Sequence, residues 1–501
     1  MLRSLILAAL ACACDLPGAA AQERREVPPA VLWVEPDGAG VAGAALVMPL
    51  LAQPAGPVDG SEARPFHSLR AALDAAPSGA LLHLGQGTYT ERISISRPVV
   101  LLGRGSGRTR LVVQGAAPAI SIAGTDRVEL YGLAVEGAGT GISIRGGSGH
   151  RLENVALRGL FEAGLTAQGA TLIFASSEVE DIGGGGKTGR GVDLEGGSLE
   201  ARRLVLRGAG RRGLVLKGAR GALDDLDVEG SGLSALQVTD GAAVRVLHGR
   251  FSSLAGAALY AGGAQLHIEG ATITGSEYSV VGFRGADVSV LGGVFSGYHV
   301  AGIALVNPGA ASVQRCRLER GGSEAAISIS GHTAVEAAIF DNRIHDPGPM
   351  GLHLTQANAR LRGNTITGAR LDREHDLGDA VYIIDGTVTL DQNVMRGNAG
   401  SGVATVRTQL KLTDNGLIEN GRAGVLLLDR SHAVATGNLF ERNARAGVEV
   451  SEFSHARLAR NRFGDSPLLD IDTGCGKGTG VADLEEGNTF RGAVRQRSCA
   501  Q

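Results

Sequence analysis

Three residues near position 370 have side chains suited to proton transfer. His353 and Tyr382 occupy equivalent positions in consecutive copies of a short motif, and Arg373 lies between them. Elimination or epimerisation at a uronic acid needs a base, an acid and a cation over the carboxylate. His353 could be the base, Tyr382 the acid and Arg373 the cation. The alternative, which we favour, is a solvated loop beside two ordinary exposed residues.

Carboxylates also cluster in this segment. The four acidic residues between 371 and 379 are Asp372, Glu374, Asp376 and Asp379. Ca²⁺ prefers clustered carboxylate oxygens, so these residues are candidate ligands for it, and no other cofactor is indicated. A plain surface loop would carry the same mixed charges to remain soluble.

A basic segment follows position 200. Its cations, with no acid among them, are Arg202, Arg203, Arg207, Arg211, Arg212, Lys217 and Arg220. Stacked in a regular fold, they could form a patch that binds a polyanion. Alternatively, they pair with the acidic residues of the next segment, 224–229.

A repeat predicts the scaffold that positions these residues. A small residue followed by apolar, any and apolar residues recurs from Ala119 to Gly447 at intervals averaging about 23 residues. A fixed period of this size indicates a solenoid, and the alternation is that of a β-strand. No repeat contains an amphipathic segment of helix length. We therefore predict an all-β, parallel β-helix of about 15 or more coils of 22–23 residues.

The middle residue of each motif should point outward, so together these residues predict one exposed column. In order, the column is Ser121, Ser143, Thr166, Asp193, Val215, Gln237, Ala258, Val281, Ala304, Ser328, His353, Tyr382, Ala404, Leu426 and Glu449. Most of these side chains are small or apolar. Asp193 and Glu449 lie many coils apart, which is too far for the two carboxylates to act together as general acid and general base.

Asparagines recur about one coil apart in the C-terminal half: Asn342, Asn364, Asn393, Asn415, Asn438, Asn461 and Asn488. Asn tolerates left-handed backbone, and its amide can bond peptide groups of adjacent coils. These residues predict a structural asparagine ladder. Cys316 has the same register and is expected to be buried in it.

The repeat and the ladder resemble those of the right-handed parallel β-helices of the pectin lyase-like superfamily. The segment from Asp59 to Phe66, then Leu69, Ala72 and Leu73 at helical spacing, resembles the superfamily's N-terminal capping helix. The resemblance implies a polysaccharide groove along the exposed column. The carboxylate clusters and the Gly-His-Gly, Arg-Ile-Lys and Asp-Pro-His-Asp motifs of its enzymes are absent, so activity is not implied.

The chain divides into four predicted segments. Residues 1–21 resemble a cleaved signal peptide, although Cys14 or Cys12 could instead accept a lipid anchor. Residues 22–64 form a lead-in segment and loop, 65–470 the β-helix with its cap, and 471–501 the last coil and cap. In an oxidising compartment Cys475 and Cys499 could form a disulfide; the alternative is two free thiols.

Composition narrows the function. The 501 residues include 77 Gly and only 4% aromatics, and the net charge is −3. Balanced charge argues against nonspecific nucleic-acid binding. No apolar run reaches the ~20 residues of a membrane-spanning helix. We expect a secreted, periplasmic or cell-surface monomer that binds a polysaccharide or protein partner without catalysis; the alternative is a lyase or epimerase acting on uronic-acid polymers.

Overall fold

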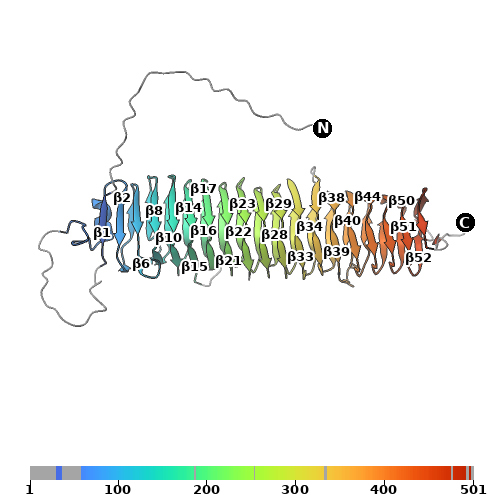
Figure 1. The fold of residues 1–501 in the computed structure, drawn as a ribbon, viewed down its shortest axis with the longest axis horizontal. Helices are drawn as coiled ribbons and strands as arrows, with labels where there is room; N and C mark the ends of the chain where they lie inside the picture. Colours follow the sequence, from blue (N-terminus) through green and yellow to red (C-terminus); the bar gives the residue numbers. More distant parts are fainter. Residues whose placement is uncertain are drawn as a thin grey trace, which may run out of the picture.

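The strands stack into one elongated parallel solenoid of about 17 turns (Figure 1). The computed structural model describes residues 30–36, 58–184, 188–252, 254–331, 336–474, 478–491 and 496–497. Each complete coil contributes one strand to each of three parallel sheets, which we call sheets 1, 2 and 3 in the order they follow within a coil. The predicted parallel β-helix is confirmed.

The strands are short because each side of a coil is only a few residues wide. Sheet 1 contains β4 (Ile93–Ile95), β7 (Ile120–Ala123), β10 (Thr140–Arg145), β13 (Ala163–Gln168), β16 (Arg190–Glu195), β19 (Arg212–Lys217), β22 (Ser234–Thr239), β25 (Ala257–Gly262), β28 (Tyr278–Phe283), β31 (Ala301–Val306), β34 (Ala325–Ser330), β37 (Met350–Thr355), β40 (Val381–Ile384), β43 (Val403–Val406), β46 (Ala423–Leu428), β49 (Ala446–Val450), β52 (Leu469–Asp472) and β55 (Gln496–Arg497). Sheet 2 contains β1 (Val31–Val34), β2 (Ala80–Leu84), β5 (Val99–Leu102), β8 (Val128–Tyr131), β11 (His150–Glu153), β14 (Thr171–Ala175), β17 (Ser198–Arg202), β20 (Arg220–Asp224), β23 (Ala243–Leu247), β26 (Gln265–Glu269), β29 (Asp287–Leu291), β32 (Ala310–Gln314), β35 (Ala337–Phe340), β38 (Asn358–Arg362), β41 (Thr387–Asp391), β44 (Gln409–Thr413), β47 (His432–Thr436), β50 (His455–Ala459) and β53 (Val481–Leu484). Sheet 3 contains β3 (Gly87–Tyr89), β6 (Thr109–Gly115), β9 (Ala134–Ala138), β12 (Ala156–Arg158), β15 (Glu178–Ile182), β18 (Val205–Ala209), β21 (Asp227–Glu229), β24 (Arg250–Ser252), β27 (Thr272–Thr274), β30 (Val294–Ser296), β33 (Arg317–Glu319), β36 (Arg343–His345), β39 (Thr365–Thr367), β42 (Val394–Arg396), β45 (Gly416–Ile418), β48 (Leu439–Glu441), β51 (Arg462–Gly464) and β54 (Thr489–Phe490).

Alternation along each strand separates the core from the surface. In β10, Ile142 and Ile144 point inward and are fully or nearly fully buried, whereas Ser143 between them is only half-buried. Each inward residue stacks on its equivalent one coil away, as Ile142 does on Leu165. The core is therefore a bundle of apolar columns running the length of the solenoid.

The corner between sheets 2 and 3 is tight and is closed by two residues. The first has left-handed backbone even when it is not glycine, as at Asn154 (φ 53°) and Asp341 (φ 57°). The second points inward; it is aliphatic in several early coils, for example Leu204, serine at Ser177, and asparagine from Asn342 onward. One residue with left-handed backbone thus helps to connect sheet 2 to sheet 3 without a longer loop.

The asparagines form the predicted ladder. Nδ2 of Asn342 donates to Oδ1 of Asn364 at 2.9 Å, and the same geometry repeats as far as Asn488. The backbone N–H of Cys316 donates to Oδ1 of Asn342 at 2.9 Å, so Cys316 occupies the expected position at the start of the ladder. A second ladder of Asn398, Asn420 and Asn443 was not anticipated.

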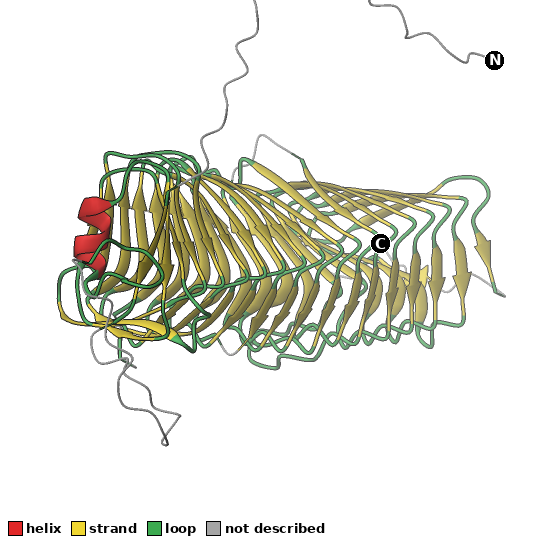
Figure 2. Ribbon diagram, turned by 60° about the vertical axis from the view of Figure 1, so that its left-hand side comes forward, coloured by secondary structure: helices red, strands yellow, loops and turns green. Residues whose placement is uncertain are grey.

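A short helix covers one end of the solenoid (Figure 2). In α1 (Leu69–Ala75), Leu69, Ala72 and Leu73 are buried, as predicted for a cap over the first coil. Ser68 Oγ accepts from the N–H of Ala71 at 3.1 Å, and Glu91 accepts from the N–H of Leu69 at 2.7 Å. The helix is thus held on the solenoid from its N-terminal end.

The predicted exposed column is wrong in two respects. Ala404, Leu426 and Glu449 keep the register of Tyr382 but are buried, at 1%, 3% and 3% exposed. One position also has the wrong residue. Tyr260, not Ala258, pairs in register with Gln237 and Val281 and points outward, while Ala258 is fully buried. Three consecutive small residues at 256–258 made the motif's start ambiguous by two residues. The column also continues past Glu449 to Asp472, its register partner on β52.

Candidate functional site

His353 and Tyr382 lie side by side on the outer face of sheet 1. They are register partners on β37 and β40, and their ring centroids are 5.8 Å apart. His353 Nε2 also lies 3.0 Å from Thr355 Oγ1. Burial lowers the pKa of His353, and burial followed by the negative charge of Asp379 raises the pKa of Tyr382. The neutral imidazole of His353, which can accept a proton, therefore lies beside the protonated hydroxyl of Tyr382.

The loop carrying Arg373 is a small closed excursion between β39 and β40. Asp372 and Leu377 exchange two backbone hydrogen bonds of 2.8 and 3.1 Å. Asp372 Oδ2 lies 2.8 Å from Nδ1 of His375, which lowers the pKa of Asp372 and raises that of His375. Arg373 is exposed on this loop.

The four proposed Ca²⁺ ligands point to different partners. Asp372 bonds within its loop, Asp376 lies 3.7 Å from Arg422 Nη1, and Glu374 is exposed. Asp379 is buried and accepts from the backbone N–H of Ser401 at 2.6 Å. Among the described residues, no group of three or more Asp, Glu, His or Cys is arranged to hold a metal ion.

The seven basic residues are distributed around the coil. Arg202 and Arg220 belong to sheet 2, Arg207 to sheet 3, and Arg212 and Lys217 to sheet 1, while Arg203 and Arg211 occupy corners. Several pair with carboxylates, including Lys217 with Glu195 at 3.2 Å and Arg207 with Glu180 at 3.5 Å. The structure thus does not gather them on one face.

A buried charge network near the C-terminal end was missed by the sequence analysis. Nη2 of Arg445 lies 3.2 Å from Glu449 and 3.5 Å from Asp472, and Nε of Arg422 lies 3.5 Å from Glu449. The Glu449 side chain is only 4% exposed and that of Asp472 is 0% exposed. The spacing of Arg422 and Arg445 by one coil is the sequence pattern that could have predicted these ion pairs. Such burial makes the two carboxylates inaccessible to a polymeric substrate.

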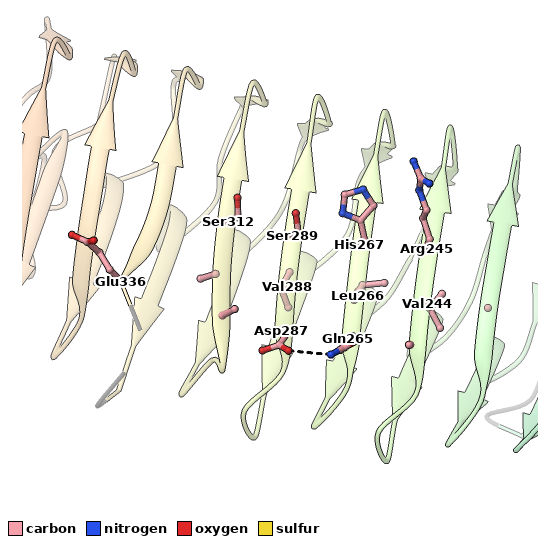
Figure 3. Close-up of a pocket in the computed structure, with 14 residues that line it drawn as sticks. Val244, Arg245, Gln265, Leu266, His267, Asp287, Val288, Ser289, Ser312 and Glu336 are labelled. Carbon is pink, nitrogen blue, oxygen red and sulfur yellow. Dashed lines mark hydrogen bonds between the residues drawn. The ribbon is translucent and has the colours of Figure 1, made fainter. Parts of the chain in front are cut away.

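A groove lies on the outer face of sheet 2. It has a volume of about 530 Å³ and crosses the strands from β20 to β32. Figure 3 shows Arg245, His267, Ser289 and Ser312 on successive strands along it. Asp287 accepts from Gln265 Nε2 at 3.4 Å at its lower side in this view. Short outward side chains such as Ser289 and Ser312 leave room for the groove.

A second cavity of about 370 Å³ continues this groove toward the N-terminal end. It crosses β11 to β20, is lined by Thr171, Ser198 and Ala222, and shares Gly221 with the first cavity. Gly221 lies in an inward column, where a Cβ atom would approach Leu216 to 2.7 Å. Farther along the same face, Trp33 stacks on His83 with ring centroids 4.5 Å apart. Sheet 2 therefore carries both a groove and an aromatic pair.

A smaller polar cavity lies on sheet 1, far from His353. It has a volume of about 220 Å³ and is lined by Ser143, Thr166 and Asp193 of the outward column. Asp193 is paired with Arg190 at 2.7 Å. This part of the expected face is thus polar, and the other acid that lines the cavity, Glu195, is likewise paired, with Lys217 at 3.2 Å.

Several predictions fall outside the described residues. These are the signal peptide at 1–21, the anchor cysteines Cys12 and Cys14, and the Cys475–Cys499 disulfide. Within the described residues Cys316 is a buried free thiol. The described part of the chain also has no helix with the length and apolarity needed to traverse a bilayer.

The three parallel sheets and the asparagine ladder define a parallel β-helix protein, and a comparison with known families gives its family. The chain belongs to the family described as right handed beta helix region, whose model matches residues 190–366 and 301–463, together more than half of the chain. The family predicted from the repeat is thus confirmed. A search of curated proteins found no match.

The chain is also similar to several solved structures. The Vag8–C1 inhibitor complex, determined by cryo-EM, matches with a TM-score of 0.51 and 14% identity, covering 84% of this chain and 99% of that chain. The pre-mature gene product 12 of bacteriophage phi29 matches with a TM-score of 0.43 and 12% identity, covering 86% of this chain and 74% of that chain. The A-module of the Azotobacter vinelandii mannuronan C-5 epimerase AlgE6 matches with a TM-score of 0.28 and 11% identity, covering 86% of this chain and 95% of that chain. At these identities the likeness concerns the fold alone.

Proposed function

We propose that this chain is an exported β-helix protein that binds a polysaccharide on the outer face of sheet 2 without catalysing a reaction on it. The observation that carries the proposal is the groove formed by two adjoining cavities across β11 to β32. Its floor presents hydroxyl, amide and charged groups between short apolar side chains, which is the composition of a site for an extended polar ligand.

The aromatic pair on the same face supports a sugar ligand. Trp33 and His83 are stacked with ring planes 16° apart, and both side chains are half-buried. Aromatic rings combine a large apolar surface with a polar edge, which suits the alternating faces of a sugar ring. The groove and the aromatic pair could therefore contact one polymer.

Affinity electrophoresis in gels containing polysaccharides tests this function. The purified protein should be retarded by at least one polysaccharide. Ala222→Trp and Ser312→Trp, which fill the groove from outward positions, should reduce the retardation. Thr272→Trp, at an exposed outward position of β27 on sheet 3, is the matched control and should not. Absence of retardation across neutral and acidic polysaccharides would contradict the proposal.

A second candidate function is supported by the His353–Tyr382 pair. The pair adjoins a small apolar cluster of Ala404, Ala423 and Leu426 on the outside of sheet 1. A neutral base beside a protonated phenol fits lyase or epimerase chemistry at a uronic acid, with Arg373 as the candidate cation. Ultraviolet absorbance from unsaturated products, present in the native protein and absent in His353→Ala and Tyr382→Phe, would establish a lyase. Proton exchange into the polymer would test epimerisation.

A further inference from the structure

We infer that the sheet 2 groove takes an uncharged polysaccharide, lying along the solenoid axis and spanning both cavities; this inference rests on the proposed function. Charge is the first argument. The residues lining the two cavities include two arginines, Arg220 and Arg245, and three carboxylates, Glu200, Asp287 and Glu336. With the histidines neutral, the groove has a formal charge of −1, which disfavours a polyanion.

Three of the five charged groups along the groove form ion pairs with residues beside it. Arg245 lies 3.0 Å from Glu269, and Glu336 lies 2.7 Å from Arg360. Glu200 is paired with Arg202 on its own strand. A polyuronate would have to break the pair with Glu269 to gain Arg245, whereas a neutral chain can leave these pairs in place.

The groups that remain in the groove suit hydroxyls. Thr171 and Ser198 lie in one cavity and Ser289 and Ser312 in the other, with the Gln265 amide beside them. A hydroxyl both donates and accepts, so it pairs with a sugar hydroxyl in either direction. These neutral hydrogen-bonding groups lie on neighbouring coils. They therefore suit an uncharged polysaccharide, whose hydroxyl groups recur along the chain.

The direction of the ligand follows from the shape of the groove. The two cavities share Gly221, and together they cross eight consecutive strands of sheet 2, from β11 to β32. At about 4.8 Å between neighbouring strands, this length is roughly 34 Å. The ligand therefore runs across the strands, parallel to the solenoid axis, and contacts one coil after another.

Affinity electrophoresis at low and high salt, with neutral and acidic polysaccharides, tests the inference. We expect a neutral polysaccharide to retard the protein equally at both salt concentrations. Ala222→Trp and Ser312→Trp lie in different cavities, so each alone should weaken binding of the long chain at least tenfold. Thr272→Trp should bind as the native protein does. Competing oligosaccharides should become effective only when long enough to reach both cavities.

The outcomes separate the two proposals. Salt-sensitive binding of polyuronates alone would overturn the inference and leave polysaccharide binding standing. Neutral binding that neither tryptophan variant changes would overturn the assignment to this groove. If no polysaccharide is bound, the proposed function itself fails, and retention on a protein partner would then identify the groove's occupant as a protein.

Discussion

Asp379 accepts a 2.6 Å hydrogen bond from the backbone N–H of Ser401, one coil further along the solenoid. Burial of its carboxyl outweighs this bond and the attraction of Arg422, and it raises the pKa of Asp379 to about 6. The folded chain therefore holds this proton more tightly than the unfolded chain does, for which the pKa is about 4.

The first prediction concerns stability against pH. Because the folded pKa is raised, the contribution of Asp379 is most favourable below about pH 4 and declines as pH rises to about 6, by at most about 3 kcal/mol. Asp379→Asn keeps the acceptor and removes the charge. We expect its melting temperature to equal that of the native protein near pH 4 and to exceed it near pH 7. A variant that is less stable only at pH 7 would show that attraction to Arg422 prevails.

The second prediction concerns the asparagine ladder. Asn393 is 1% exposed; it donates to Asn415 at 3.0 Å and accepts from the N–H of Asn364 at 2.9 Å. Asn393→Ala leaves buried groups on both neighbouring coils without partners, at about 1–3 kcal/mol each. We expect a loss of roughly 3 kcal/mol in chemical denaturation. Thr365→Ala, at an exposed position on β39, should change stability little, and an equal loss in both variants would contradict the ladder's role.

The third prediction concerns the start of the ladder. The thiol of Cys316 is 2% exposed and its Sγ lies 3.2 Å from the carbonyl oxygen of Gln314. Cys316→Asn extends the ladder by one coil, because the asparagine amide can donate to the carbonyl groups that the thiol now faces. Its melting temperature should match or exceed that of the native protein, whereas Cys316→Ala should lower it. The reverse order would mean that this coil is too tightly packed for an amide.

The fourth prediction contrasts two histidines of one region. Burial lowers the pKa of His353, while hydrogen bonding to Asp372 raises that of His375. In an NMR titration His375 should therefore protonate at a higher pH than His353. Asp372→Asn should move only the His375 midpoint downward. Coincident midpoints in the native protein would contradict the burial of His353, and with it the neutral base required by the second candidate function.

The sequence carried enough information for the fold because the solenoid repeats one local pattern. The strand motif that contains Ile142 and the corner asparagine that follows Asp341 each recur once per coil. The role of a residue in one coil therefore predicts the role of the equivalent residue in the next coil. The prediction failed at Tyr260, where consecutive small residues hid the register. It also ended before Asp472, because Asp470 replaces the motif's small residue.

The candidate sites were less accessible to sequence reasoning. The adjacency of His353 and Tyr382 follows from the period and is confirmed in the structure. The groove on sheet 2 is different, because it depends on which outward side chains of that sheet are short, as at Ala222, Ser289 and Ser312, and the repeat motif does not specify them. The loop partners of Asp372 and Asp376 likewise depend on how an excursion folds back, which no period encodes.

The direction of the hydrogen bonds between coils has a mechanical consequence. Each coil is bonded mainly to its two neighbours, and bonds such as that from Asn342 to Asn364 connect residues 22 positions apart. Pulling on the two ends of the chain would peel coils from the ends one at a time rather than shear the whole sheet. Each rupture would release roughly 70 Å of extended chain. Force spectroscopy of this molecule should thus show a series of small, evenly spaced steps.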